Sequence, residues 1–225
     1  MKKVHVVVLV VALILIGANA ALAAVVGTKH DMTSIATGSG VGFSVGQGEV
    51  CVYCHTPHDA NTAVGMTLLW NRTFGDAAAT YTPYTSATST VAGSTTMSSV
   101  TKVCLSCHDG SVAVFTMGNA PNYGGSISEM TGVSGNVSIA GMISGNPRLT
   151  ADMSNDHPIS FDYATAVSYN PAGEYQATLP VTLPLVGGNM ECSTCHDVHG
   201  SVANTAFLRI DNDRSALCLT CHLLK

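Results

Sequence analysis

Aromatic and charged side chains are both scarce in this chain of 225 residues. Phe, Trp and Tyr together make up 6% of the sequence, with Trp70 as the single tryptophan, and Asp, Glu, Lys and Arg make up 10%. So few large aromatic residues provide little of the apolar volume that the core of a chain of this length needs. We therefore expect something other than side chains to fill part of the interior.

Basic residues are particularly few, apart from those at the start of the chain. Without Lys2 and Lys3, seven of the nine Lys and Arg residues remain, against fourteen Asp and Glu residues. Nucleic-acid-binding proteins instead gather positive charge on one face. The composition therefore excludes a nucleic-acid partner.

The first 24 residues have the features of a secretory signal peptide. Two lysines precede the apolar run VVVLVVALILIGA, and the small residues ANAALAA follow it. The alternative is a retained membrane helix, but the run is shorter than the roughly 18 to 20 apolar residues that such a helix needs. We expect residues 1–24 to be removed, leaving one secreted domain at residues 25–225 with no membrane span.

Cysteine occurs nowhere outside one repeated motif. The four copies are CVYCH at residues 51–55, CLSCH at 104–108, CSTCH at 192–196 and CLTCH at 218–222, so a histidine follows every Cys-x-x-Cys pair. This is the attachment motif of c-type haem, in which the two thiols bind the porphyrin edge and the adjacent imidazole binds the iron. The motifs predict four covalent haem c groups, attached through Cys51, Cys54, His55, Cys104, Cys107, His108, Cys192, Cys195, His196, Cys218, Cys221 and His222.

Two other chemistries use Cys-x-x-Cys pairs. Zinc ribbons pair two such units about 15 to 20 residues apart and give no reason for a histidine after each pair. A thioredoxin-type redox site uses one reactive pair in a βαβ unit rather than four copies in a chain rich in Gly, Ser and Thr. Haem attachment explains the whole pattern, and these alternatives do not.

Four histidines outside the motifs match the four iron positions that the motif histidines leave open. They are His30, His58, His157 and His199, and His5 in the signal peptide is the only other histidine. The match predicts two histidine ligands on every iron, although methionine is an alternative ligand because eight methionines beyond Met1 are available.

Two of these histidines come three residues after a motif histidine, in CHTPH and CHDVH. Histidines on opposite sides of one iron need backbones roughly 12 Å apart, whereas positions i and i+3 of a helix are only about 5 to 6 Å apart. We therefore expect His58 and His199 to complete neighbouring haems. The next motif in sequence is the natural partner, Cys104 and Cys107 for His58, and Cys218 and Cys221 for His199.

The remaining sequence is typical of a mostly irregular fold with short α-helices and little β-structure, organised as a single haem-packed unit. Long stretches dense in Gly, Ser, Thr and Asn separate the motifs. Helices are expected at the motifs themselves, over residues 47–56, 98–107, 189–197 and 213–224.

Taken together, TKHDMT, GQGEVCVYCHTPH, KVCLSCHDGSV, NDHPISF and CSTCHDVHG resemble the extracellular tetrahaem filament cytochromes of the OmcE type. The resemblance covers most of residues 25–225. It implies a homo-oligomeric filament with a continuous haem chain, in which a distal histidine can cross to the next subunit. His30 is the predicted crossing ligand, and the alternative is that it serves its own chain.

Iron with both axial positions filled by protein cannot bind substrate, so the predicted activity is electron transfer rather than enzymatic catalysis. We expect electrons to pass to partner cytochromes or extracellular metal oxides. One alternative is a soluble periplasmic electron shuttle. Another is a nitrogen-oxide-converting enzyme, which requires an iron with an open position.

Overall fold

A computed structural model describes residues 25–32, 41–43, 50–62, 68–75, 81–85, 97–114, 116–119, 130–133, 142–169, 173–200 and 204–223. Turns and irregular backbone connect short helices and two small two-stranded sheets. The predicted fold class is thus confirmed. The predicted signal peptide lies outside the described residues, and the single domain over residues 25–225 stays a prediction.

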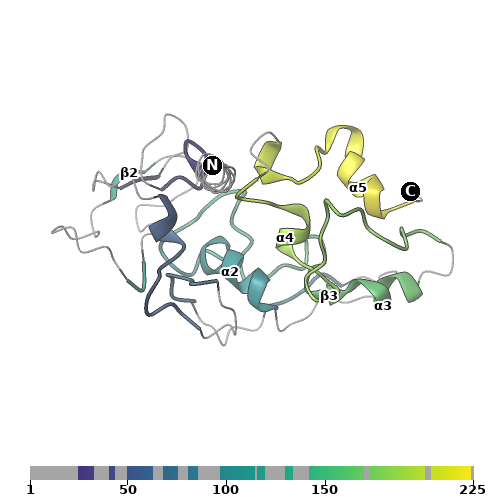
Figure 1. The fold of residues 1–225 in the computed structure, drawn as a ribbon, viewed down its shortest axis with the longest axis horizontal. Coiled ribbons are helices and arrows are strands. Elements are labelled where there is room, and N and C mark those ends of the chain that lie inside the picture. Colours follow the sequence, from purple (N-terminus) through teal and green to yellow (C-terminus); the bar gives the residue numbers. More distant parts are fainter. Residues whose placement is uncertain are drawn as a thin grey trace, which may run out of the picture.

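The helices are all short. The α-helices are α2 (Ser99–His108), α3 (Tyr163–Ser168), α4 (Cys192–Cys195) and α5 (Ala216–Cys221), and the 3-10 helices are η1 (Val50–Tyr53), η2 (Thr205–Phe207) and η3 (Asp213–Ser215). Four of them, η1, α2, α4 and α5, carry cysteines of the four motifs. Figure 1 shows α2, α4 and α5 following one another along the long axis. No helix of the described residues is long and apolar enough to span a membrane.

Both sheets are antiparallel pairs. Strand β1 (Val41–Phe43) pairs with β2 (Met130–Val133), and β3 (Phe161–Asp162) pairs with β4 (Asn189–Met190). Strand β4 leads directly into α4 through Glu191, so the second sheet fixes the start of the third motif.

Helix α2 begins and ends where its sequence predicts. The Ser98 side chain accepts a hydrogen bond from the Thr101 amide, which satisfies one of the free donors at the helix start. Gly110 adopts φ +73°, a left-handed conformation that favours glycine and ends the helix. The prediction of a helix over 98–107 is confirmed within one residue at each end.

The other predicted helices are shorter than expected. Only Val50–Tyr53 of the first is helical among its described residues, and the third is reduced to Cys192–Cys195 because His196 is extended, with φ −111° and ψ 141°. Helix α3 was not predicted, although Asp162 caps it by accepting the Thr165 amide.

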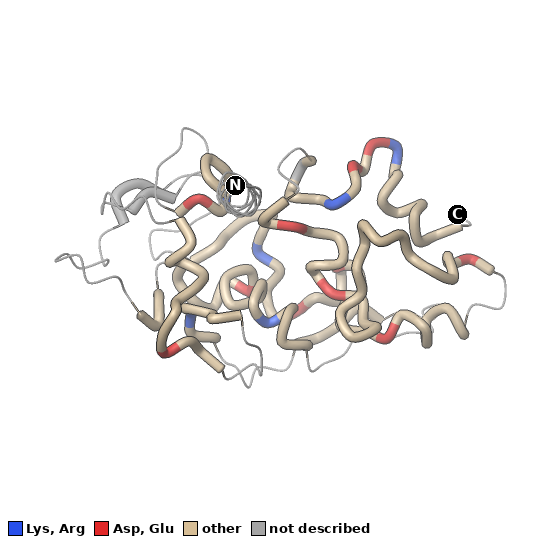
Figure 2. Tube along the Cα trace, in the orientation of Figure 1, with Lys and Arg blue, Asp and Glu red and all other residues tan. Residues whose placement is uncertain are grey.

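The apolar core of the described residues consists of two small clusters that share α2. One contains Met32, Tyr53, Cys107 and Val114, and the other contains Tyr81, Met97, Leu105 and Met153. Helix α2 contacts α4, so the second and third motifs lie together inside the molecule. Charged residues are sparse and scattered along the trace (Figure 2).

Candidate functional site: haem attachment motifs and histidine pairs

All eight cysteines lie in the described part of the chain, and all are free thiols. The four motifs are called the first, second, third and fourth in chain order. The thiols of Cys51 and Cys218 are exposed, that of Cys107 is buried, and the rest are intermediate. Free thiols are what thioether attachment of a porphyrin requires.

A backbone carbonyl holds the imidazole of each of the first three motifs. The Nδ1 atom lies 2.7 Å from the Leu68 oxygen in His55, 2.8 Å from the Pro147 oxygen in His108, and 2.8 Å from the Ala206 oxygen in His196. Because a carbonyl can only accept, Nδ1 carries the proton and donates it. The lone pair of each ring is then on Nε2, the arrangement typical of metal-binding histidines.

In the first, third and fourth motifs, a segment from elsewhere in the chain pairs antiparallel with the end of the motif, and we call this segment the clasp. In the first clasp, Thr56 N–H donates to Leu69 O and Asn71 N–H donates to Cys54 O, each at 2.8 Å. This places residues 68–71 antiparallel to the end of the motif, with a bridge between His55 and Trp70. The left-handed conformation of Leu69, with φ 53°, turns the chain there.

The third motif repeats this arrangement. Asp197 N–H donates to Phe207 O and Arg209 N–H donates to Cys195 O, again at 2.8 Å, with a bridge between His196 and Leu208. The fourth motif has the same backbone pattern, formed by Leu223 with Glu174 and by Gln176 with Cys221. Three of the four motifs therefore use one positioning device.

Sequence reasoning missed the clasps, although a signal for two of them exists. Both CXXCHXXH motifs are followed, within about a dozen residues, by Thr and three apolar residues, TLLW at 67–70 and TAFL at 205–208. Backbone carbonyls hold the imidazoles of the first three motifs, and the nearby carboxylate of Asp197 instead accepts the His199 and Gly200 amides.

Six histidines form three ring pairs with nearly equal separations. The ring centres are 6.1 Å apart for His30 and His108, 6.1 Å for His55 and His199, and 6.3 Å for His157 and His222. A metal–nitrogen bond of about 2 Å on each side, plus about 1.1 Å from each nitrogen to its ring centre, puts the ring centres of two axial imidazoles about 6.2 Å apart. Each pair therefore has the spacing that one shared iron requires.

These pairs differ from the predicted partners of three histidines. His199 lies against His55 of the first motif rather than His222 of the fourth, because CHDVH turns extended at His196. His30 lies against His108 of its own chain, which favours the alternative that it serves that chain. His108 of the second motif therefore contacts His30, whereas the sequence analysis assigned His58 to that motif.

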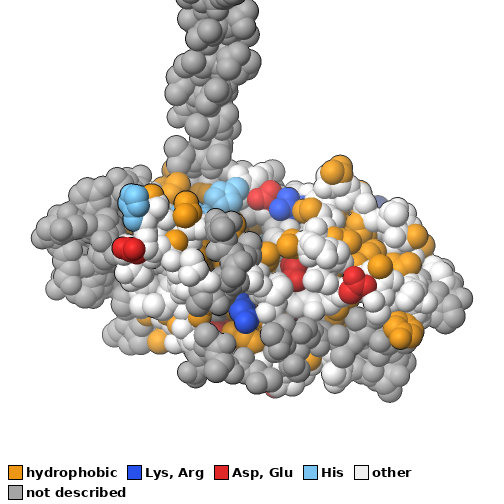
Figure 3. Space-filling view, turned by 60° about the horizontal axis from the view of Figure 1, so that its bottom comes forward, with side chains coloured by type: hydrophobic (Ala, Val, Ile, Leu, Met, Phe, Trp, Pro, Cys, Tyr) orange, Lys and Arg blue, Asp and Glu red, His pale blue; other side chains and the backbone are white. Residues whose placement is uncertain are grey.

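His58 and His196 are left over. Both side chains are exposed, and neither has such a ring pair among the described residues. The turn that carries His58 is firmly held: Thr56 Oγ1 and Asn119 Nδ2 each donate to the His58 carbonyl at 2.9 Å. Figure 3 shows histidine side chains at the surface of the molecule.

Comparison with known proteins identifies the C-terminal part of the chain. Residues 184–223, which contain the third and fourth motifs, match the family described as Doubled CXXCH motif. The match indicates a multihaem c-type cytochrome. No curated protein matches the chain significantly.

The cysteines of the four motifs meet in chain order. Burial, followed by the nearby Cys107 thiol, raises the pKa of Cys54 to about 12. A hydrogen bond with Cys192, together with burial, raises the pKa of Cys104. Burial, followed by the nearby Cys221 thiol, raises the pKa of Cys195 to about 11. The attachment sites therefore adjoin one another as first to second, second to third and third to fourth.

Buried polar atoms without partners also gather at the attachment sites. Among the described residues they are His30 Nδ1, Trp70 Nε1, Arg72 Nε and Glu191 Oε1. His30 pairs with the second motif, Trp70 lies edge-on to His55 at 6.0 Å, and Glu191 directly precedes Cys192. Unsatisfied buried groups are rare in folded proteins. Their position beside every one of the first three motifs fits a chain built to hold polar, charged cofactors.

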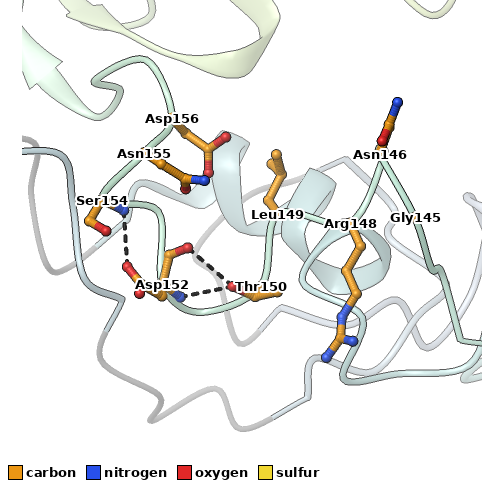
Figure 4. Close-up of a pocket in the computed structure, with 9 residues that line it drawn as sticks. All are labelled: Gly145, Asn146, Arg148, Leu149, Thr150, Asp152, Ser154, Asn155 and Asp156. Atoms are coloured by element: carbon orange, nitrogen blue, oxygen red, sulfur yellow. Dashed lines mark hydrogen bonds between the residues drawn. The ribbon is translucent and has the colours of Figure 1, made fainter.

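A polar pocket of about 520 Å³ lies beside the second motif, formed by residues 145–156 (Figure 4). Its lining has neither histidine nor cysteine, and its side chains form hydrogen bonds with the backbone of the same segment, as when the Ser154 amide donates to Asp152 Oδ1 at 3.1 Å. The same segment supplies the Pro147 carbonyl to His108. The pocket is thus part of the support of the second motif rather than a haem site.

Proposed function

We propose that the chain is a tetrahaem cytochrome that passes single electrons from haem to haem and assembles into an extracellular filament. The observation that carries the proposal is the set of three histidine pairs at 6.1 to 6.3 Å, with one motif histidine left over. Bound haem c supplies one-electron chemistry at iron. The protein's part is to fill both axial positions and to hold the four groups in sequence.

The filament follows from the two unpaired histidines. His196 needs a second imidazole, and His58 presents one on a held turn at the surface. Within one chain the three other motifs already have partners. If His58 of one copy completes the third site of the next, each copy joins its neighbour by a metal bond, and the haem series continues from one subunit to the next.

Such an assembly suits electron transfer to acceptors outside the cell, such as metal oxides or partner cytochromes. Imidazole on both sides of an iron leaves no position for substrate. The low proportion of charged residues also leaves little repulsion between copies that stack.

Substitution of His58 by alanine tests this proposal. The wild-type protein should appear as filaments in electron microscopy and elute as large species, whereas the variant should elute as a monomer that still carries four haems. Asp59→Asn, a change in the same exposed turn, is the matched control and should still assemble. A wild-type protein that is monomeric at all concentrations would contradict the filament and support the periplasmic shuttle.

A second candidate function rests on the same unpaired histidine. If no second copy supplies His58, the third iron keeps an open position, and an enzyme acting on a small ligand such as nitrite becomes the better description. Cyanide added to the assembled ferric protein distinguishes the two. An unchanged spectrum supports pure electron transfer, and tight binding at one haem supports the enzyme.

A further inference from the structure

Two charged side chains are buried at the attachment sites without an opposite charge. Arg72 is 0% exposed and Glu191 is 1% exposed, and each has one polar atom without a partner, Nε in Arg72 and Oε1 in Glu191. Neither takes part in an ion pair among the described residues. Burying an unpaired charge is unfavourable. Both residues therefore destabilise the fold, and a function of the charge would explain why the chain contains them.

Arg72 lies between the first and second attachment sites. Its two terminal nitrogens donate to the backbone carbonyls of Val114 and Ala113, the latter at 2.8 Å, and neither acceptor neutralises the guanidinium. Arg72 directly follows the first clasp, and its acceptor Val114 belongs to the same buried cluster as Tyr53 and Cys107 of the first two motifs. Arg72 is therefore a cation at the junction of the first two haems.

Glu191 occupies the equivalent position between the second and third sites. Its Oε2 atom accepts hydrogen bonds from Thr101 Oγ1 at 2.5 Å and from Ser160 Oγ at 2.9 Å. The distance from Thr101 Oγ1 lies in the range of O–H···O⁻ hydrogen bonds. Thr101 belongs to α2, and its hydroxyl also lies 3.7 Å from the Cys192 sulfur. The carboxylate thus lies where the second and third motifs touch.

Asp31 is the third buried charged side chain, and it has a different setting. One of its oxygens accepts the Gly27 amide at 2.7 Å, within the turn that carries His30. Asp31 therefore helps to hold the N-terminal turn, whereas Arg72 and Glu191 lie between motifs that are far apart in sequence.

We propose that Arg72 and Glu191 set the reduction potentials along the haem series, with Arg72 raising those of the first and second haems and Glu191 lowering those of the second and third. Reduction adds one negative charge at an iron, which a nearby cation stabilises and a nearby anion destabilises. Inside a protein this effect is several times stronger than in water. The proposal rests on the haem attachment proposed above.

The test is potentiometric titration of the purified, haem-loaded protein, with each haem followed by the NMR signals of its methyl groups. Glu191→Gln keeps an oxygen that accepts the two hydroxyl bonds but removes the charge, and it should raise the potentials of the second and third haems. Arg72→Gln should lower the potentials of the first and second haems. The fourth haem should keep its potential in both variants.

Charge-conserving variants separate electrostatics from packing. Glu191→Asp and Arg72→Lys disturb the same contacts but keep the charge, so their potentials should stay close to wild type. Asp213→Asn and Arg214→Gln, at side chains 81% and 94% exposed, should move no potential. Unmoved potentials in both Gln variants, or equal shifts in the charge-conserving ones, would overturn the proposal. Absorbance and mass report haem content separately: a protein without haem at the second and third motifs would refute the proposed function itself.

Discussion

The Nδ1 atoms of His55, His108 and His196 are each committed to a backbone carbonyl, and this fixes what the rings can do. A carbonyl cannot move away by changing rotamer or protonation state, as an aspartate can. The proton therefore stays on Nδ1, and Nε2 is the nitrogen that can bind a metal. The orientation of each ring therefore depends on a backbone segment that lies 10 to 39 residues away in the sequence.

The ring pairs predict which haem responds to loss of a histidine. His199→Ala removes the ring that lies 6.1 Å from His55, so the haem of the first motif should become high-spin and bind cyanide. Electron paramagnetic resonance of the ferric protein measures this change. His58→Ala should leave the first and second haems low-spin, and a high-spin fourth haem in His199→Ala would show that the pairing is wrong.

Tyr163 should make stability depend on alkaline pH. Burial is the main reason that the pKa of Tyr163 rises to about 12, above the value of about 10 in an unfolded chain. Its contribution is fully present below about pH 10 and is lost as the pH rises through about 12. When denaturant unfolding is measured from pH 8 to pH 11.5, the free energy of unfolding should fall more steeply with pH in wild type than in Tyr163→Phe.

At pH 8 the Tyr163→Phe variant should be less stable by about 1 kcal/mol, because the hydroxyl donates to the Gln176 carbonyl at 2.7 Å. If the free energy of unfolding falls equally with pH in the two proteins, the proposed effect of Tyr163 is contradicted.

The clasps are the elements that connect sequence motifs to haem geometry. None contains a helix or strand longer than a few residues, so their order comes from hydrogen bonds rather than from the propensity of a long element. In the first clasp, Asn71 is central: its Nδ2 donates to Val52 O and Asn119 O, and its Oδ1 accepts the Asn119 amide.

Removal of the Asn71 side chain should therefore loosen the first site. Asn71→Ala loses three hydrogen bonds at a residue 1% exposed and should reduce the free energy of unfolding by about 3 kcal/mol. Urea unfolding measures the loss, and the matched change Asn155→Ala at an exposed position should cost less than about 0.5 kcal/mol. A similar cost at both positions would contradict the role of Asn71.

Helix prediction succeeded where local signals agree and failed where tertiary contacts decide. Helix α2 has a Ser98 cap and a Gly110 stop, both visible in the sequence. Helix α4 ends early because the clasp pulls His196 into an antiparallel bridge with Leu208, which no local pattern reveals. The argument that His196 and His199 lie apart agrees with the ring contacts, but it assumed a helical CHDVH and chose the fourth motif as the partner of His199, and the structure shows neither.

At the scale of the whole molecule, the order of the motifs in sequence becomes their order in space. Cysteine contacts connect the first motif to the second, the second to the third and the third to the fourth. Spacing in sequence predicted the motifs and their cofactor, but it could not predict that His199 would lie against His55, more than a hundred residues away. That contact joins the N-terminal and C-terminal parts of the chain.

The spin-state count of the ferric protein tests the central claim most directly. The protein is held monomeric by dilution and then concentrated until it assembles, with electron paramagnetic resonance recorded in both states. The three ring pairs predict three low-spin haems and one high-spin haem in the monomer, and four low-spin haems in the assembly. Four low-spin haems in the monomer, or more than one high-spin haem in the assembly, would contradict the account.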